Sequence, residues 1–248
     1  RNLRHEHDRL PPLGQGSLDR AHSWLGQTPQ VPYCPERCDF DFRWWLEYSG
    51  GQVTDWGVHH MDIALWALGL ENTGPCAIEG KGSFPQIPNG FNVAVDFDCN
   101  LTFADGQVCR LHSGQNELII TGEKGRIRVN RGGLTGKPVE ELTKEDEDWI
   151  NEEIVKLCHG KDPSGANGSD SKAGAHMQNF FDCMRDGGKC ISDPWTHHRS
   201  VSACHLANIA MQLGRRLEFD PDQEVFVGDE QANSFLARES RKGFEINM

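Results

Sequence analysis

The sequence lacks an apolar stretch of the roughly 20 residues that a membrane-spanning helix needs. Its longest apolar segments, 63–70 and 207–213, are far shorter and are typical of buried helices. Basic residues are also scarce, because 25 Lys and Arg stand against 37 Asp and Glu, giving a net charge of −12. Without a basic stripe to neutralise phosphates, the composition disfavours binding to nucleic acid or to an anionic membrane surface.

A dinucleotide-binding fingerprint is also missing. Gly14-Gln15-Gly16 lacks the third glycine, and no strand pattern precedes it and no clean helix pattern follows it. The pattern of a phosphate-binding P-loop is absent as well. The chain is therefore not expected to supply the main pyrophosphate site of a nucleotide cofactor.

The nine cysteines are scattered, and their number is odd in a chain too large to need disulfide staples. We interpret them mostly as small buried apolar residues of a reducing compartment. Cys34 and Cys38 are close in sequence, but no second pair with ligand spacing follows, so no metal site is predicted there.

The chain begins at Arg1 and shows no signal peptide or transit segment. We therefore expect a fragment of a longer protein. A cytoplasmic location is predicted, and a periplasmic one stays open because a leader would precede Arg1.

Residues 1–38 are irregular, because prolines and glycines interrupt any periodicity. They predict an extended arm that packs on a second unit, the domain 39–248, with a short helical turn near 18–25. Further along, helical periodicity predicts helices over 53–70, 143–157, 176–186 and 195–217 and near 230–239. Thr54 is a candidate cap for the first of these helices, and Gly69 is a candidate terminator.

Between the first two helices the pattern changes to near alternation of apolar and polar residues, which predicts antiparallel strands. Asp105-Gly106 and Lys124-Gly125 are hairpin signals. Helices before and after a strand meander, without alternating βαβ units, indicate an α+β fold. The predicted strands are 93–97, 99–103, 108–112, 118–121 and 126–129, with a last extended segment at 224–227.

Segment 50–62, GGQVTDWGVHHMD, has the composition of a reactive site. Asp55 and His59 are four residues apart, which places them on one helix face, and Asp62 continues that face. A carboxylate beside an imidazole orients the ring and stabilises its charged form, which makes the histidine usable as an acid or base. A simple surface pair is the alternative. Zinc binding by His59, His60 and Asp62 is disfavoured, because adjacent histidines on a helix diverge.

Two further groups are candidates for substrate binding. Arg43, with five donors, and Trp44 lie in a dense aromatic run that is typical of a core or a subunit interface but also suits a sugar surface. His198 lies in the triplet His197-His198-Arg199 that opens a predicted helix, where a capping or surface role is the alternative. The aromatic run contains Phe40, Phe42, Trp44, Trp45 and Tyr48.

The segment GGQVTDWGVHHMDIALWALG, residues 50–69, resembles the signature of the Gfo/Idh/MocA oxidoreductases, named for glucose–fructose oxidoreductase and inositol dehydrogenase. VPYCPERCDFDFRWWLEYSGG is similar to the arm and aromatic strand of that family, and ITGEKGRIRVNRG to its strand-turn-strand unit. Residues 176–221 are similar to the last long helices of a bacterial branch, and ANSFLARESRKGFEI resembles the terminal segment. The resemblance covers nearly the whole chain.

The resemblance implies the carboxy-terminal, substrate-facing half of an NAD(P)-dependent enzyme. Its fold would be an α+β domain with an open, mostly antiparallel sheet and flanking helices, and the sheet would form a homodimer or tetramer interface. The Rossmann domain that binds NAD or NADP, and a catalytic lysine from its E-K-P motif, would lie before Arg1. The catalytic aspartate and histidine would be Asp55 and His59.

The activity that this family implies is oxidation of a hydroxyl group of a sugar or polyol. Arg43, Trp44, His60, Asp62 and His198 are then the candidate substrate-binding residues. A glycosidase-like reaction that uses NAD transiently on the same scaffold is one alternative. A non-catalytic carbohydrate-binding or assembly module is another. No metal is expected, and the fragment alone is expected to be inactive.

Overall fold

The computed structural model of the chain describes residues 24–157 and 170–245. Residues 1–23, which include most of the predicted arm, lie outside the described residues, and the division into an arm and a domain stays a prediction. Three short 3₁₀ helices, η1 (Pro35–Arg37), η2 (Asp39–Trp44) and η3 (Gly51–Val53), come first. The α-helices are α2 (Trp56–Leu68), α3 (Lys137–Glu140), α4 (Lys144–Leu157), α5 (Asp170–Asp186), α6 (Pro194–Leu213) and α7 (Glu230–Asn233).

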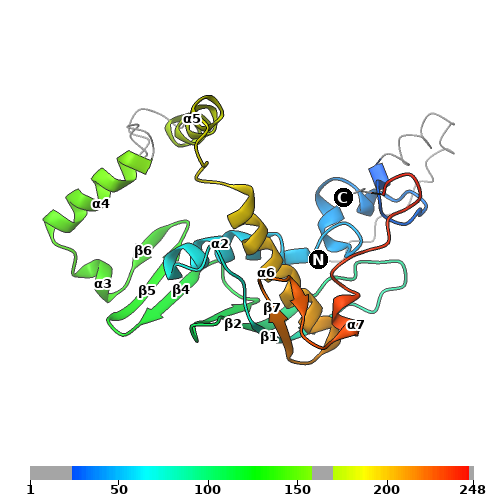
Figure 1. Cartoon of the computed structure of the whole chain (residues 1–248). Helices are drawn as coiled ribbons and strands as arrows, with labels where there is room; N and C mark the ends of the chain where they lie inside the picture. Colours follow the sequence, from blue (N-terminus) through cyan, green and yellow to red (C-terminus); the bar gives the residue numbers. More distant parts are fainter. Residues whose placement is uncertain (1–23, 158–169, 246–248) are drawn as a thin grey trace, which may run out of the picture.

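The described strands form two sheets, and every pair of neighbouring strands is antiparallel. The five-stranded sheet has the order β3-β2-β1-β7-β8, and the three-stranded sheet has the order β4-β5-β6. Helices flank these open sheets (Figure 1), which confirms the predicted α+β fold class. The strands are β1 (Ala77–Ser83), β2 (Asp96–Thr102), β3 (Val108–His112), β4 (Leu118–Gly122), β5 (Gly125–Asn130), β6 (Gly133–Thr135), β7 (Leu217–Asp220) and β8 (Val225–Phe226).

Both predicted hairpins are confirmed. The turn at Asp105-Gly106 joins β2 to β3, and Gly106 has the positive φ of 86° that such a turn requires. The turn at Lys124-Gly125 joins β4 to β5. The prediction of two separate strands at 93–97 and 99–103 is wrong. The structure has the single strand β2 there, and buried and exposed side chains alternate along it without a break.

Strand β1 has no alternating apolar pattern, so the sequence did not predict it. Its centre contains Gly80, and a Cβ there would lie 2.4 Å from the Sγ of Cys99 on β2. The residue is glycine because the neighbouring strand's thiol occupies the space of a side chain. Packing, rather than local preference, places this segment in the sheet.

Helices α2 and α6 supply the helical side of the core, and Figure 1 shows α6 crossing the five-stranded sheet. Eleven residues of α6 are buried. Ala203, Ala207 and Ala210 lie at three- and four-residue steps and are almost fully buried, so the helix can approach the sheet closely. The helix ends at Gly214, with φ +64°, and not at 217 as predicted, because Leu217 begins β7.

The prediction that most cysteines are buried is confirmed only in part. Cys99 and Cys204 are buried in the core, and desolvation raises the pKa of each thiol to about 12. The other described cysteines are half-buried, and all those described are free thiols.

The aromatic segment that was expected to form a strand does not do so. Residues 39–44 form the 3₁₀ helix η2, which begins at Asp39 with a φ of +50°. Trp45 then closes the turn, because its indole donates a hydrogen bond to the carbonyl of Glu36 at 2.8 Å and its ring is buried. The run therefore contributes one core residue, Trp45, and two exposed rings, those of Phe40 and Phe42.

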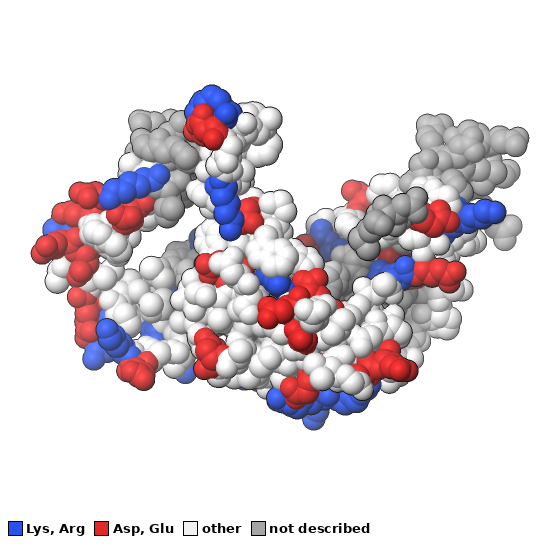
Figure 2. Space-filling view, in the orientation of Figure 1, with Lys and Arg blue, Asp and Glu red and all other residues white. Residues whose placement is uncertain are grey.

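The open face of the five-stranded sheet is polar. Asp98 and Arg110 form a two-point ion pair across β2 and β3, with N–O distances of 2.8 and 2.7 Å. Acidic and basic side chains are mixed over the visible face of the molecule, with acidic groups dense along α4 (Figure 2). A homo-oligomer through this sheet stays a prediction.

None of the helices in the described ranges combines the length and the apolar character needed to cross a bilayer. The predicted location of the protein is not tested by the fold.

We predict that Leu101→Ala, on β2, lowers the free energy of unfolding by about 2–5 kcal/mol. Leu101 is fully buried, so truncation removes apolar contacts and leaves a cavity. Val108→Ala on the neighbouring strand is the matched control, because Val108 is 55% exposed and should change stability by about 0.5 kcal/mol or less. Urea titration followed by circular dichroism measures both, and equal effects would contradict the assigned strand faces.

Candidate functional site

The glycine-rich entry to α2 is a tight, hydrogen-bonded turn. The Oγ1 of Thr54 accepts a hydrogen bond from the amide of Gly50 at 2.9 Å, and Asn208 of α6 donates to the carbonyl of Gly50 at 3.0 Å. Thr54 was predicted to cap α2, which is wrong, because its hydroxyl is engaged in the turn before the helix. Asp55 occupies the cap position but makes no capping bond with its side chain. Gly69 ends the helix as predicted, with a φ of +70°.

Arg43, Trp44 and Asp55 come together at the start of α2. The guanidinium of Arg43 forms an ion pair with the carboxylate of Asp55, and its Nε donates to the carbonyl of Phe40 at 3.0 Å. The same guanidinium lies 3.6 Å from the ring centroid of Phe40 and 5.6 Å from that of Trp44. The cation is thus fixed by two aromatic rings and a carboxylate.

The pair that helical spacing predicted, Asp55 with His59, is not formed. Asp55 precedes the first helical residue, and its φ and ψ of −87° and −87° are not helical, so the four-residue rule does not apply to it. Its carboxylate is bound to Arg43 instead. Among the described residues, no hydrogen bond or ion pair joins Asp55 to His59.

His59 lies exposed on the first turn of α2. Its ring meets the ring of Trp56 edge-on, with 6.1 Å between centroids, and the guanidinium of Arg131 lies 5.2 Å from the Trp56 centroid. Within the described ranges, neither ring nitrogen of His59 has a hydrogen-bond partner. An imidazole of this kind is open to a ligand. His60, one residue on, is half-buried, and no described residue forms a hydrogen bond or ion pair with it.

Asp62 points instead toward α6. Its carboxylate accepts a hydrogen bond from the hydroxyl of Ser200 at 2.8 Å and lies 3.8 Å from the Nδ1 of His197. The other ring nitrogen of His197 contacts the hydroxyl of Ser192. The sequence therefore predicted one aspartate–histidine pair, at Asp55 and His59, and the structure brings together a different one.

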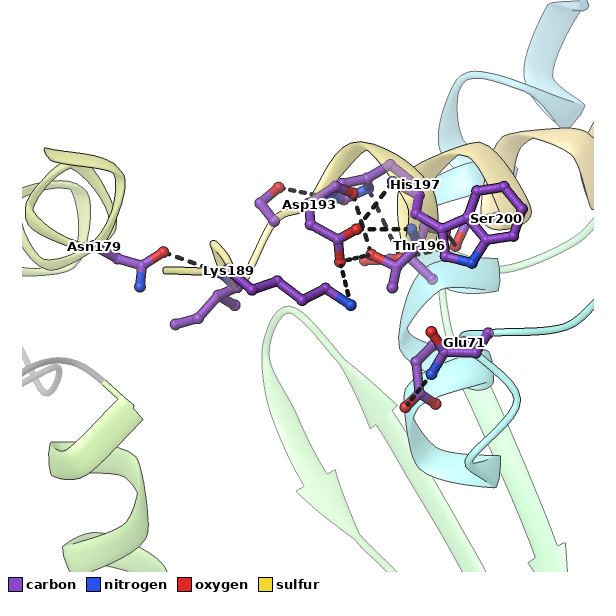
Figure 3. Close-up of polar contacts among 12 residues, drawn as sticks. Glu71, Asn179, Lys189, Asp193, Thr196, His197 and Ser200 are labelled. Atoms are coloured by element: carbon purple, nitrogen blue, oxygen red, sulfur yellow. Dashed lines mark hydrogen bonds and ion pairs between the residues drawn. The ribbon is translucent and has the colours of Figure 1, made fainter. Parts of the chain in front are cut away.

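The start of α6 is held firmly beside α2. Figure 3 shows Lys189 reaching Asp193, at 3.2 Å, while the same carboxylate accepts a hydrogen bond from the hydroxyl of Thr196 at 3.0 Å. Asp193 also caps the helix, because it accepts from the amide of Trp195 at 3.0 Å. These bonds fix the turn that carries His197 and Ser200.

His198 lies apart from the other candidates. It pairs with Glu224 at 2.6 Å and borders a cavity with a volume of about 1070 Å³. Arg43, Asp55, His59 and Asp62 do not line that cavity. The cavity beside α6 and the reactive side chains of the α2 motif therefore lie in two different parts of the molecule. No three His, Cys, Asp or Glu side chains of the described residues are grouped so as to hold a metal ion.

Comparison with known proteins decides the family. The model of the oxidoreductase family, C-terminal alpha/beta domain, of Gfo/Idh/MocA proteins matches residues 13–132 and 169–246. The chain belongs to the Gfo/Idh/MocA oxidoreductase family. A search of curated proteins found no match.

Solved structures give weaker likenesses. The WlbA dehydrogenase from Bordetella pertussis, in complex with NADH and UDP-GlcNAcA, is 16% identical over 72% of this chain, with a TM-score of 0.48. An NAD-binding protein from Listeria innocua is 19% identical over 78% of it, with a TM-score of 0.46. Aldose-aldose oxidoreductase from Caulobacter crescentus, complexed with glycerol, is 14% identical over 72% of it, with a TM-score of 0.42. This Gfo/Idh/MocA chain spans 50%, 52% and 50% of the length of those three proteins.

We predict that Gly51→Ala destabilises the fold by about 2–5 kcal/mol, because it combines backbone strain with crowding. Gly51 has a φ of +69°, and a Cβ there would lie 2.7 Å from the Cβ of Val93. Gly69→Ala is the matched control, since Gly69 has a φ of +70° but no heavy atom within 4 Å of an added Cβ. The control should cost about 1–2 kcal/mol. Equal losses in thermal unfolding would contradict the close packing of the α2 entry.

Proposed function

We propose that this chain is the substrate-facing part of an NAD(P)-dependent oxidoreductase that oxidises a hydroxyl group of a sugar or polyol. Asp55 and His59 are its catalytic residues. The observation that carries the proposal is the state of the α2 motif in a chain of this family: the imidazole of His59 is exposed on the first turn of the helix, and Arg43 holds the carboxylate of Asp55, which precedes that helix.

His59 acts as the general base in this scheme. Its exposed ring can accept the proton of a substrate hydroxyl, because no described side chain occupies either ring nitrogen. Trp56 limits the orientations of the ring through its edge-on contact. Protonation of His59 then places a positive charge on the first turn of α2, and Asp55 is proposed to stabilise this charged form.

Arg43 has a positioning role. Its ion pair fixes the Asp55 carboxylate, and its stacking on Phe40 and Trp44 fixes the guanidinium itself. The donors that Asp55 and Phe40 leave unused, together with the ring of Trp44, suit the hydroxyls and the C–H surface of a sugar. His60 and Asp62 are proposed to assist substrate binding from the same helix. Asp62 would act from its position between α2 and α6.

A nicotinamide cofactor, NAD or NADP, would supply the acceptor for the hydride. The described strands are all antiparallel, so no strand-to-helix turn of a dinucleotide-binding unit lies among them. We derive no contact to the cofactor from these residues. Its main site, and the family's catalytic lysine, are proposed to lie in a nucleotide-binding domain outside this chain.

The test is the formation of reduced cofactor by the full-length protein that carries this chain, with NAD⁺ or NADP⁺ and a panel of sugars and polyols. We expect His59→Ala to lower kcat about 10²–10⁴-fold, because the proton acceptor is lost. Asp55→Asn should also lower kcat, since it keeps the size of the side chain but removes the negative charge that is proposed to stabilise protonated His59. His112→Ala, on the polar face of β3, is the matched histidine control and should leave kcat unchanged.

Two outcomes contradict the dehydrogenase. Cleavage of a glycoside without net formation of reduced cofactor would favour the glycosidase-like reaction. A folded protein that binds the cofactor but neither reduces it nor cleaves a glycoside would favour a carbohydrate-binding or assembly module.

A further inference from the structure

The cavity beside α6 is separate from the α2 motif and has the size of a small-molecule site. Its volume is about 1070 Å³, at the upper end of the range in which small ligands bind. One stripe of α6 forms its wall, at steps of three and four residues. The stripe consists of His198, Ser202, His205, Ile209 and Gln212.

Three segments that are distant in sequence form much of the rest of the wall: residues 27–29, 46–50 and 234–239. The C-terminal segment is tied to the first of these, because the amide of Arg241 donates to the carbonyl of Gln27 at 2.9 Å and its side chain donates to that of Gly26 at 2.6 Å. Figure 1 shows the two ends of the described chain meeting there. Tertiary contacts therefore hold together two of the segments that line this open cavity.

A hydrogen-bonded histidine with a fixed orientation lies on the wall. The Nε2 of His198 donates to the carboxylate of Glu224 at 2.6 Å, and Arg199 donates to the same oxygen at 3.0 Å. Arg199 is only 6% exposed and is also held by the carbonyl of Pro221 at 2.6 Å. The ring of Trp195 stacks on that of His198, with 5.8 Å between centroids. In the neutral ring, the proton lies on Nε2 toward Glu224 and Nδ1 is an acceptor.

The backbone of Glu224 is strained. Its φ is +54°, a region in which glycine or asparagine is more comfortable than glutamate. The turn does not need a carboxylate at this position, because Asp220 already accepts from the amides of Asp222 and Gln223 at 2.9 and 3.0 Å. A strained acidic residue that orients a histidine at a cavity wall is typical of a functional position.

The remaining lining defines the chemistry of a ligand. Three glutamates face two arginines, so the wall has no excess of positive charge with which to attract an anion. Desolvation, together with the charge of Arg238, lowers the pKa of His205. Hydroxyl, phenol and amide groups alternate with apolar rings, as suits a molecule with both hydroxyls and C–H faces. These polar groups and rings belong to Tyr48, Ser202, Gln212, Ser234, Phe219 and Phe235.

We propose that this cavity is a second binding site, distinct from the Asp55–His59 motif, for a neutral hydroxyl-rich ligand of the sugar or polyol class. His198 accepts a hydrogen bond from a ligand hydroxyl through Nδ1, and Glu224 and Arg199 hold the ring in the orientation that allows this. The site needs no nicotinamide cofactor, so it stands or falls independently of the proposed oxidoreductase activity.

Isothermal titration calorimetry of this chain with myo-inositol and with D-glucose tests the proposal. We expect saturable binding that His198→Gln and Glu224→Asn each weaken at least tenfold. Asparagine is chosen because it accepts a positive φ and so preserves the turn while removing the carboxylate. His112→Gln, an exposed histidine on β3, is the matched control and should bind as the parent chain does. Thermal unfolding of each variant verifies that it is folded.

Three results would overturn the proposal. One is the absence of heat with both probes for a folded chain. Another is binding that His59→Ala abolishes and His198→Gln leaves intact, which would place the ligand at the α2 motif. The third is tighter binding of inorganic phosphate than of either probe, which would show an anion site.

Discussion

Burial of α6 is the constraint on which the rest of the structure depends. The helix lies against the five-stranded sheet through small and apolar side chains, and two polar residues on it are bonded to the α2 region. Ser200 fixes Asp62 within α2, and Asn208 fixes the carbonyl of Gly50 at its entry. On another side, His198 lines the cavity. One buried helix therefore positions both the family motif and the separate cavity, and a shift of α6 would disturb both.

The sequence predicted well those parts of the fold that local chemistry determines. Gly69 ends α2, and Asp105-Gly106 turns β2 into β3, because a positive φ or a tight turn strongly favours particular residues. The sequence did not predict the elements whose structure is determined by tertiary packing. Strand β1 is formed by pairing with β2 around a glycine that accommodates Cys99, and the aromatic run became a 3₁₀ helix because Trp45 is drawn into the core.

The candidate site shows the same division. Asp55 and His59 could be selected from residue type and spacing, but the partner of Asp55 could not, since helical geometry does not extend to a residue before the helix. Ser200 is 138 residues from Asp62, and Glu224 is 26 residues from His198. No local signal links such pairs, so Ser200 as the partner of Asp62 and Glu224 as the partner of His198 become visible only once α6 is placed.

We propose above that His59 accepts the proton of the substrate hydroxyl while Arg43 holds the carboxylate of Asp55. The most direct measurement is a crystal structure of the full-length protein with reduced cofactor and a sugar or polyol substrate bound together. The account predicts a substrate hydroxyl within hydrogen-bonding distance of a ring nitrogen of His59, with the Arg43–Asp55 ion pair intact. A substrate whose reacting carbon lies against the nicotinamide ring while His59 remains turned to solvent would contradict it.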